Sequence, residues 1–158
     1  MQPQLLRIAQ TGDNFSMKRN SRLSLALHTM SHMAGEPDRV RTSADIAEHA
    51  GTNPVVVRRV LGKLREAGLL RSEKGHAGGW RLAKSAETIT LADVYLALDE
   101  RLVSGTNTEM EPSHCSVETG LHTRVAQVLG DIEESLVERL RETTITEVHS
   151  STCSYCDS

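Results

Sequence analysis

Residues 42–70 of this chain read TSADIAEHAGTNPVVVRRVLGKLREAGLL, and the pattern in this stretch predicts two short helices separated by a tight turn. Thr42 has the position of a helix N-cap, and Asp45, three residues later, is its reciprocal capping partner. Gly51 ends this first helix because glycine readily adopts the left-handed conformation of a helix C-terminus.

The second helix starts at Asn53 and Pro54, a capping residue followed by proline at the first helical position, and Gly68 stops it. One stripe is apolar, and the other face is partly basic. The apolar stripe holds Val57, Val60, Leu61 and Leu64, and the other face holds Val55, Arg58, Arg59, Gly62 and Lys63. Two such helices around a turn of about four residues are typical of a helix-turn-helix, whose second helix enters the major groove of DNA.

A predicted β-hairpin follows, with strands at residues 69–73 and 80–82 and a glycine-rich tip at residues 75–79. Glycine permits positive φ and close backbone approach, so such a tip fits against a phosphate ridge or into a minor groove. Lys74, His76 and Arg81 supply its positive charge. A nucleotide-binding loop is not favoured, because neither Gly-Lys-Ser/Thr nor an immediate helix follows. The hairpin is therefore interpreted as the wing of a winged helix.

Before the helix-turn-helix, residues 22–34 show helical spacing of apolar residues, and Gly35 ends the predicted helix. His28 and His32 lie one turn apart in it. Such a pair binds metal in some proteins, but no carboxylate or thiol lies nearby in the sequence. We therefore interpret these two residues as core or partly exposed side chains.

The net charge of −3 is unevenly distributed along the 158 residues. Residues 17–84 hold 13 basic and 6 acidic side chains, whereas residues 85–158 hold 4 basic and 14 acidic ones. The balance is thus +7 in the first segment and −10 in the second. This asymmetry indicates a basic surface joined to an acidic body, and the basic part suits a nucleic-acid partner.

After the wing, Thr90 and Asp93 predict a capped helix that continues to Leu98, followed by a loop at residues 103–116. Residues 117–141 then predict a long helix whose apolar stripe contains Leu121, Val125, Val128, Ile132, Leu136 and Leu140. A helix of about 25 residues is roughly 37 Å long, too long for this domain to bury alone. We expect it to pack against a second copy of itself, the alternative being an intramolecular helix laid over the domain.

The expected fold is mainly α with a small β-hairpin wing, and it divides the chain into five parts. These are an N-terminal extension (1–16), a winged helix-turn-helix DNA-binding domain (17–99), a sensor loop (100–116), a dimerisation helix region (117–148) and a cysteine-containing tail (149–158). No run approaches the ~18 apolar residues of a membrane span, and the N-terminus does not resemble a signal peptide. Three cysteines do not make a secreted disulfide framework, so we expect a cytoplasmic protein.

Four stretches resemble, in order and spacing, the Rrf-type winged helix-turn-helix transcription regulators, a family that includes iron–sulfur and nitric-oxide sensors and a regulator of cysteine metabolism. The stretches are residues 42–47, 60–70, 78–83 and 89–94. The wing followed by Ile89-Thr90-Leu91 is the most specific of them.

The resemblance implies a homodimer that acts without enzymatic activity on a pseudo-palindromic, double-stranded DNA operator, usually as a repressor. The recognition helix would enter the major groove from Pro54 to Arg59, and the wing would reach a minor groove. Arg58 and Arg59 are candidates for base or phosphate contact, and Lys63 and Lys74 for phosphate contact or solvation. The complete set of candidate DNA-binding residues is Thr42, Ser43, Asn53, Pro54, Val55, Arg58, Arg59, Lys63, Lys74, His76 and Arg81.

Cluster-binding members of the family carry three closely spaced cysteines in the sensor loop, and this chain departs from that pattern. Only Cys115 falls in the loop, next to His114, whereas Cys153 and Cys156 lie near the C-terminus. Three alternatives stay open. Cys115 is a lone redox-active thiol, or the cysteines form a disulfide, or the three thiolates bind zinc or an iron–sulfur cluster together with His114 or His149. We expect thiol redox control and no cofactor.

Two other classes of function are compatible with parts of the sequence. Cys153 and Cys156 form a C-x-x-C pair, which a thiol–disulfide oxidoreductase would use, although no predicted helix follows it to lower a thiol pKa. A winged helix that binds protein rather than DNA would suit the acidic half. This alternative predicts that the protein shows no salt-dependent binding to promoter fragments.

Overall fold

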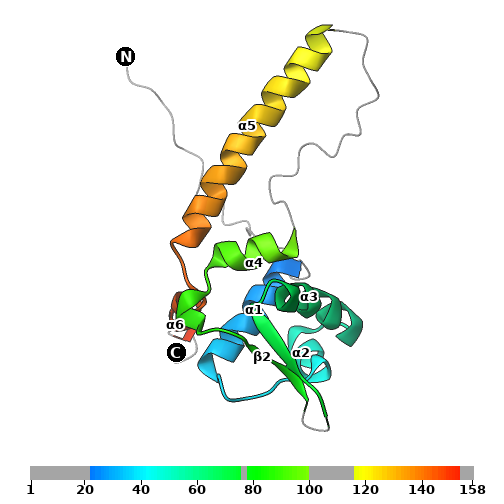
Figure 1. Cartoon of the computed structure of the whole chain (residues 1–158), viewed down its shortest axis with the longest axis vertical. Coiled ribbons are helices and arrows are strands. Elements are labelled where there is room, and N and C mark those ends of the chain that lie inside the picture. The colour runs from blue at the N-terminus through cyan, green and yellow to red at the C-terminus, as the bar shows by residue number, and fades with distance from the viewer. Residues whose placement is uncertain (1–21, 76–77, 100–115, 154–158) are drawn as a thin grey trace, which may run out of the picture.

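A computed structural model of the chain describes residues 22–75, 78–99 and 116–153. Helices and one hairpin make up this part (Figure 1). The elements are α1 (Arg22–Gly35), α2 (Ser43–Ala50), α3 (Pro54–Glu66), β1 (Leu70–Glu73), β2 (Gly79–Leu82), the short 3-10 helix η1 (Ala86–Thr88), α4 (Leu91–Leu98), α5 (Ser116–Arg141) and α6 (Ile145–Cys153).

The first helix of the helix-turn-helix, α2, is delimited by side-chain and backbone caps at its two ends. The Asp45 amide donates to Thr42 Oγ1 (3.1 Å), and the Thr42 amide donates to Asp45 Oδ2 (3.2 Å), which completes the predicted capping box. Hydrogen bonding to Thr42 holds the pKa of the Asp45 carboxyl below its usual value. Gly51 has a φ of 62°, the left-handed conformation that ends a helix at least cost in glycine.

The core lies between α1, α3 and α4, and α2 and α6 cover its sides. The apolar stripe of α3 is fully buried, as its spacing predicts, with Val57, Val60, Leu61 and Leu64 each no more than 1% exposed. Met30 and Met33 of α1 and Leu98 of α4 pack against it. Trp80 and Tyr95 are the aromatic members of this core, and aliphatic and methionine side chains supply most of its buried surface.

The hairpin forms an antiparallel pair in which Leu70 lies opposite Leu82 and Ser72 lies opposite Trp80. Arg41 extends the sheet by one bridge, because its amide and carbonyl both bond to Trp80, at 3.3 and 2.9 Å. The Trp80 indole Nε1 also donates to Ser43 Oγ, at 2.9 Å. These contacts attach the wing to the segment that leads into α2.

The long helix α5 has no buried residue, and Figure 1 shows it projecting from the body, with its Ser116 end farthest away. Its last turns, with Leu136, Val137 and Leu140, pack against the core. Five large apolar side chains nearer its start are 44–77% exposed: Val117, Leu121, Val125, Val128 and Ile132. The predicted stripe is thus divided into a part that anchors the helix and a part without an intramolecular partner among the described residues.

A sixth α-helix, α6, was not among the predicted elements. Thr144 and Glu147 form a third capping box at its start, with the Thr144 amide donating to Glu147 Oε2 at 2.6 Å. Ile145 is fully buried, and α6 packs along α1. The predicted boundary between residues 117–148 and 149–158 therefore falls inside a helix. The helices and strands predicted elsewhere in the described ranges are confirmed to within about two residues at their ends.

Candidate nucleic-acid interface

The outward face of α3 combines apolar and cationic side chains near the start of the helix. Val55 and Val56 are 55% and 41% exposed, and Arg58 and Arg59 are exposed beside them. Neither arginine side chain forms a hydrogen bond or ion pair with any described residue. Two unengaged guanidinium groups on a rigid helix suit contact with guanine edges or phosphates. Val56 was missing from the predicted set because helical spacing alone placed it between the two faces.

The N-terminus of α3 is compatible with an anionic partner. Asn53 Oδ1 accepts a hydrogen bond from the Val55 amide at 2.8 Å, and Pro54 occupies the first helical position, as predicted. The first turn contains no acidic residue. The positive end of the helix dipole is therefore not offset by a carboxylate in this turn, which favours a nearby phosphate.

Thr42 and Ser43 at the start of α2 are engaged within the protein. The Thr42 hydroxyl caps α2, and the half-buried Ser43 hydroxyl accepts the indole hydrogen bond from Trp80. Both therefore position the first helix and the wing relative to each other. Neither side chain is presented as freely as Arg58 or Arg59.

The wing carries one exposed cation and one engaged cation. Lys74 is exposed and has no side-chain partner among the described residues. Arg81 is instead held in the hairpin, where its Nε lies 3.6 Å from Glu73 Oε1 and its guanidinium donates to the Asp38 carbonyl. These contacts support the wing, and the DNA contact expected for Arg81 stays a prediction. His76 lies outside the described residues.

Lys63 has a contact within the domain that its predicted role did not include. Its Nζ donates to the carbonyl of Leu98 at 3.0 Å, in a half-buried position between α3 and α4. Leu98 ends α4, where carbonyls lack intrahelical partners and the helix dipole favours a cation. The structure therefore gives Lys63 a packing role that the spacing along α3 did not reveal.

Most of the predicted sensor residues lie outside the described part of the chain, namely His114, Cys115 and Cys156. Cys153 is the last residue of α6, and His149 of the same helix packs against Gly35 of α1. Ser116, the neighbour of Cys115, stands at the distal end of a 26-residue helix, which spans about 39 Å. Figure 1 shows α6 beside the body, far from that end.

A cluster of three histidines lies beside the helix-turn-helix and was missed by the sequence prediction. The predicted pair His28 and His32 on α1 is joined by His49 from α2, and one ligand nitrogen from each lies within 4.8 Å of the others. Only the crossing of α1 and α2 brings His49 there. His49 is 17 residues from His32 in the sequence, so no helical spacing indicated that the two side chains meet.

The membrane prediction agrees with the described helices, none of which is both long and apolar enough to span a bilayer.

Comparisons with known proteins identify the family. A family model described as Rrf2, iron-dependent transcriptional regulator, matches residues 19–151. YwnA of Bacillus subtilis, named as a candidate helix-turn-helix transcriptional regulator, is 29% identical over 82% of this chain and 95% of its own. IscR of Vibrio campbellii, a transcriptional regulator, is 30% identical over 66% of each chain.

Among solved structures, the oxidised form of Staphylococcus aureus CymR has a TM-score of 0.57 and 25% identity, over 84% of this chain and 96% of that one. The relatives are transcriptional regulators and not enzymes, which confirms that prediction and disfavours the oxidoreductase alternative. With the winged helix and the exposed basic face of α3 described above, these matches show that the chain belongs to the Rrf2 family of DNA-binding transcriptional regulators.

Proposed function

We propose that this protein is a homodimeric, cytoplasmic repressor that binds a pseudo-palindromic operator. The start of α3 enters the major groove, and the wing reaches the adjacent minor groove. The observation that carries this proposal is the exposed face of α3, on which Arg58 and Arg59 have no partner within the described residues. Arginine pairs that serve only protein stability would be expected to contact a carboxylate or a carbonyl.

The residues of the predicted set divide into two roles in this proposal. Arg58, Arg59 and Val55 contact bases or the sugar–phosphate backbone, and Lys74 contacts phosphate from the wing. Thr42, Ser43, Asn53 and Pro54 fix the helix ends from which these contacts are made, and Lys63 and Arg81 hold α3 and the wing on the domain.

Dimerisation is supported by the apolar stripe on the distal part of α5. Its members follow one another at intervals of three and four residues, which places them on one face of the helix. Five large apolar side chains exposed together on a projecting helix suit packing against the same helix of a second copy. Such a dimer presents two copies of α3 to two half-sites.

The test uses genomic DNA, since the operator is defined by what the protein retains. Fragments bound by the wild type are sequenced, and a labelled fragment is titrated by fluorescence anisotropy. Arg58→Ala with Arg59→Ala should abolish specific retention while the dimer stays intact. Arg139→Ala, in the last turn of α5, removes a positive charge outside both α3 and the distal apolar stripe and is the control. Normal retention by the double variant would rule out α3 as the recognition helix.

We further propose that the oxidation state of Cys115 controls operator affinity. Support comes from the departure of this chain from the three-cysteine loop and from its similarity to Staphylococcus aureus CymR, a relative whose structure has been solved in an oxidised form. A disulfide requires Cα atoms within about 7 Å. The length of α5 therefore disfavours pairing of Cys115 with Cys153 inside one protomer. Oxidant should change affinity in the wild type and in Cys153→Ser, but not in Cys115→Ser.

A second candidate is favoured by one observation, the description of the family as iron-dependent. Three thiolates and an imidazole from His114 are a legitimate ligand set for zinc or an iron–sulfur cluster. Absorption spectra and metal content of anaerobically purified protein distinguish this candidate from bare thiols.

A further inference from the structure

We propose that His28, His32 and His49 form a binding site for one divalent transition-metal ion that prefers imidazole ligands, such as Zn²⁺. The site joins α1 to α2 and does not involve the cysteines. It stands independently of the proposed operator binding, because it rests only on the arrangement of these three side chains.

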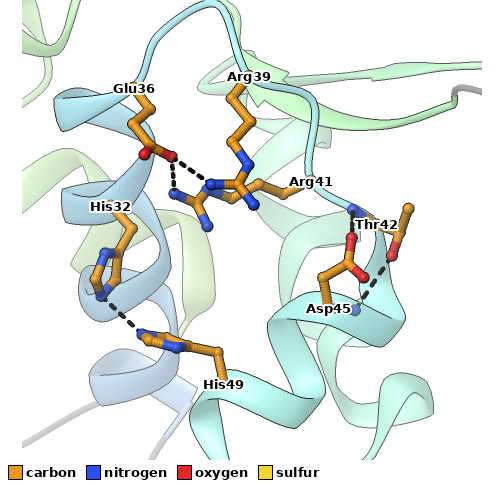
Figure 2. A network of polar contacts seen from close by, with 7 residues as sticks. All are labelled: His32, Glu36, Arg39, Arg41, Thr42, Asp45 and His49. Atoms are coloured by element: carbon orange, nitrogen blue, oxygen red, sulfur yellow. Dashed lines mark hydrogen bonds and ion pairs between the residues drawn. The ribbon is translucent and has the colours of Figure 1, made fainter.

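The separation of two of the ligand atoms already suits a shared metal. His32 Nε2 and His49 Nε2 lie 3.1 Å apart (Figure 2). Two nitrogens bound to zinc at about 2.0–2.1 Å with a tetrahedral angle lie roughly 3.4 Å apart. In the metal-free protein one ring donates a hydrogen bond to the other at this distance. Metal binding through both Nε2 atoms would break only this hydrogen bond between His32 and His49, since each neutral ring can carry its proton on Nδ1.

The third ligand completes a known type of arrangement. His28 and His32 are separated by four residues on α1, the spacing that places two imidazoles on one face of a helix for zinc. Their ring centroids are 4.6 Å apart, and those of His28 and His49 are 5.2 Å apart. Because all three ligand atoms lie within 4.8 Å of one another, rotation of the exposed His28 side chain is the main adjustment needed.

The surroundings of His28 and His32 disfavour the protonated form of these two side chains. Partial burial lowers the pKa of His28 and of His32, and the neighbouring histidines lower both further. The neutral imidazole is the form that binds metal. Two further groups also lower the pKa of His32, the Arg41 guanidinium and His149.

The positive charge of Arg41 would oppose a metal ion, but it is compensated. Arg41 lies 2.5 Å from Glu36 Oε2, and Arg39 reaches the same oxygen at 3.0 Å (Figure 2). The carboxylate therefore lies between the guanidinium groups and partly neutralises them.

The surroundings offer space and a polar partner for a further ligand. The three histidines line a cavity of about 10 Å³ together with Thr29 and Arg41, close to the least volume that holds one water molecule. Thr29 is 3% exposed, and its buried hydroxyl has no hydrogen-bond partner among the described residues. It can accept a hydrogen bond from a metal-bound water. His28 and His49 also line a neighbouring pocket of about 390 Å³, which gives access from solvent.

The test is a zinc titration of the tag-free full-length chain in which Cys115, Cys153 and Cys156 are replaced by serine, in competition with a chromogenic chelator. We expect one zinc per protomer and a rise in melting temperature of about 5–10 °C at a free zinc concentration 100 times the dissociation constant. His49→Gln and His28→Gln should each weaken binding by more than the roughly 10–100-fold that loss of an outer-shell partner costs.

His122→Gln is the matched control, because His122 lies on α5 away from the cluster and should leave the titration unchanged. The melting temperature of each zinc-free variant shows whether it has folded. Co²⁺ in place of Zn²⁺ should give visible bands of a tetrahedral nitrogen site without thiolate charge-transfer absorption. The proposal is overturned if the cysteine-free protein binds no stoichiometric zinc, or if folded His49→Gln and His28→Gln bind it as tightly as their parent.

Discussion

Replacing Gly79 by alanine should detach the wing from the helix-turn-helix. Gly79 starts β2, and a Cβ built there would lie 2.5 Å from the Arg41 carbonyl oxygen and 2.8 Å from Val40 Cγ1. The nearer of these atoms belongs to the backbone, so the chain around Arg41 must move rather than a flexible side chain. That movement separates Arg41 from Trp80.

The cost follows from the contacts that would be lost. Two backbone hydrogen bonds join Arg41 and Trp80, at 2.9 and 3.3 Å, and each contributes about 0.5–1.5 kcal/mol net. Loss of both lowers the free energy of unfolding by about 1–3 kcal/mol. For a chain of this size, each kcal/mol shifts the melting temperature by about 2–4 °C. We therefore expect a decrease of roughly 2–12 °C.

Trp80 is the single tryptophan of the chain, so its fluorescence reports on the wing alone. It is 9% exposed in the attached wing, and detachment should shift its emission to longer wavelength in Gly79→Ala before global unfolding. Gly62→Ala is the control, because no described residue outside the local helix backbone lies within 4 Å of a Cβ there, and alanine favours the helix interior by about 0.5–1 kcal/mol. If Gly79→Ala melts at or above the wild-type temperature with unchanged emission, the substitution does not detach the wing.

Three further predictions concern binding, assembly and pH. Arg58→Ala should weaken operator binding by about 1–3 kcal/mol per half-site if it pairs with guanine, whereas loss of a phosphate contact would instead reduce the salt dependence, as anisotropy at several salt concentrations would show. Leu121→Asp, at a side chain 63% exposed, should give the mass of a monomer in light scattering without loss of secondary structure, and a persistent dimer would rule out this face of α5 as the dimer interface. Because the folded-state pKa values of His28 and His32 are lowered, the folded chain binds fewer protons than the unfolded chain, so stability should fall as pH drops below about 6.5. In denaturant titrations, the free energy of unfolding of His28→Gln should depend less on pH than that of the wild type. An equal pH dependence in the two proteins would contradict the lowered pKa of His28.

Local signals explain why most of the fold was predictable. The capping pairs at Thr42 and Thr90 and the glycine at residue 51 each act within one turn of helix, so the sequence displays them directly. The same signal is present at Thr144 and Glu147, three residues apart, yet α6 was not predicted. The residues from Ile145 to Cys153 form a short segment without a long apolar stripe, so the pattern favoured the end of a dimerisation region and a tail.

The parts that could not be predicted depend on how distant elements cross. His49 meets His32 only because α2 lies across α1, and Lys63 meets the Leu98 carbonyl only because α3 packs beside the last turn of α4. Periodicity specifies which face of a helix is apolar, but not which backbone carbonyl lies within reach of a side chain at the edge of that face.

Several basic side chains of residues 17–84 have partners within the domain, so only part of the positive charge of this segment is available to contact DNA. Arg81 is paired with Glu73, Arg41 and Arg39 share Glu36, and Lys63 caps α4. Arg81 holds the wing and Lys63 holds α3, whereas Arg39 and Arg41 pair with Glu36 between α1 and α2, so the charge of these side chains serves partly in contacts within the domain. The cations left without partners at the proposed interface, Arg58, Arg59 and Lys74, lie on the recognition helix and the wing. Recognition would therefore depend on where the domain holds these few groups more than on the net positive charge of the segment.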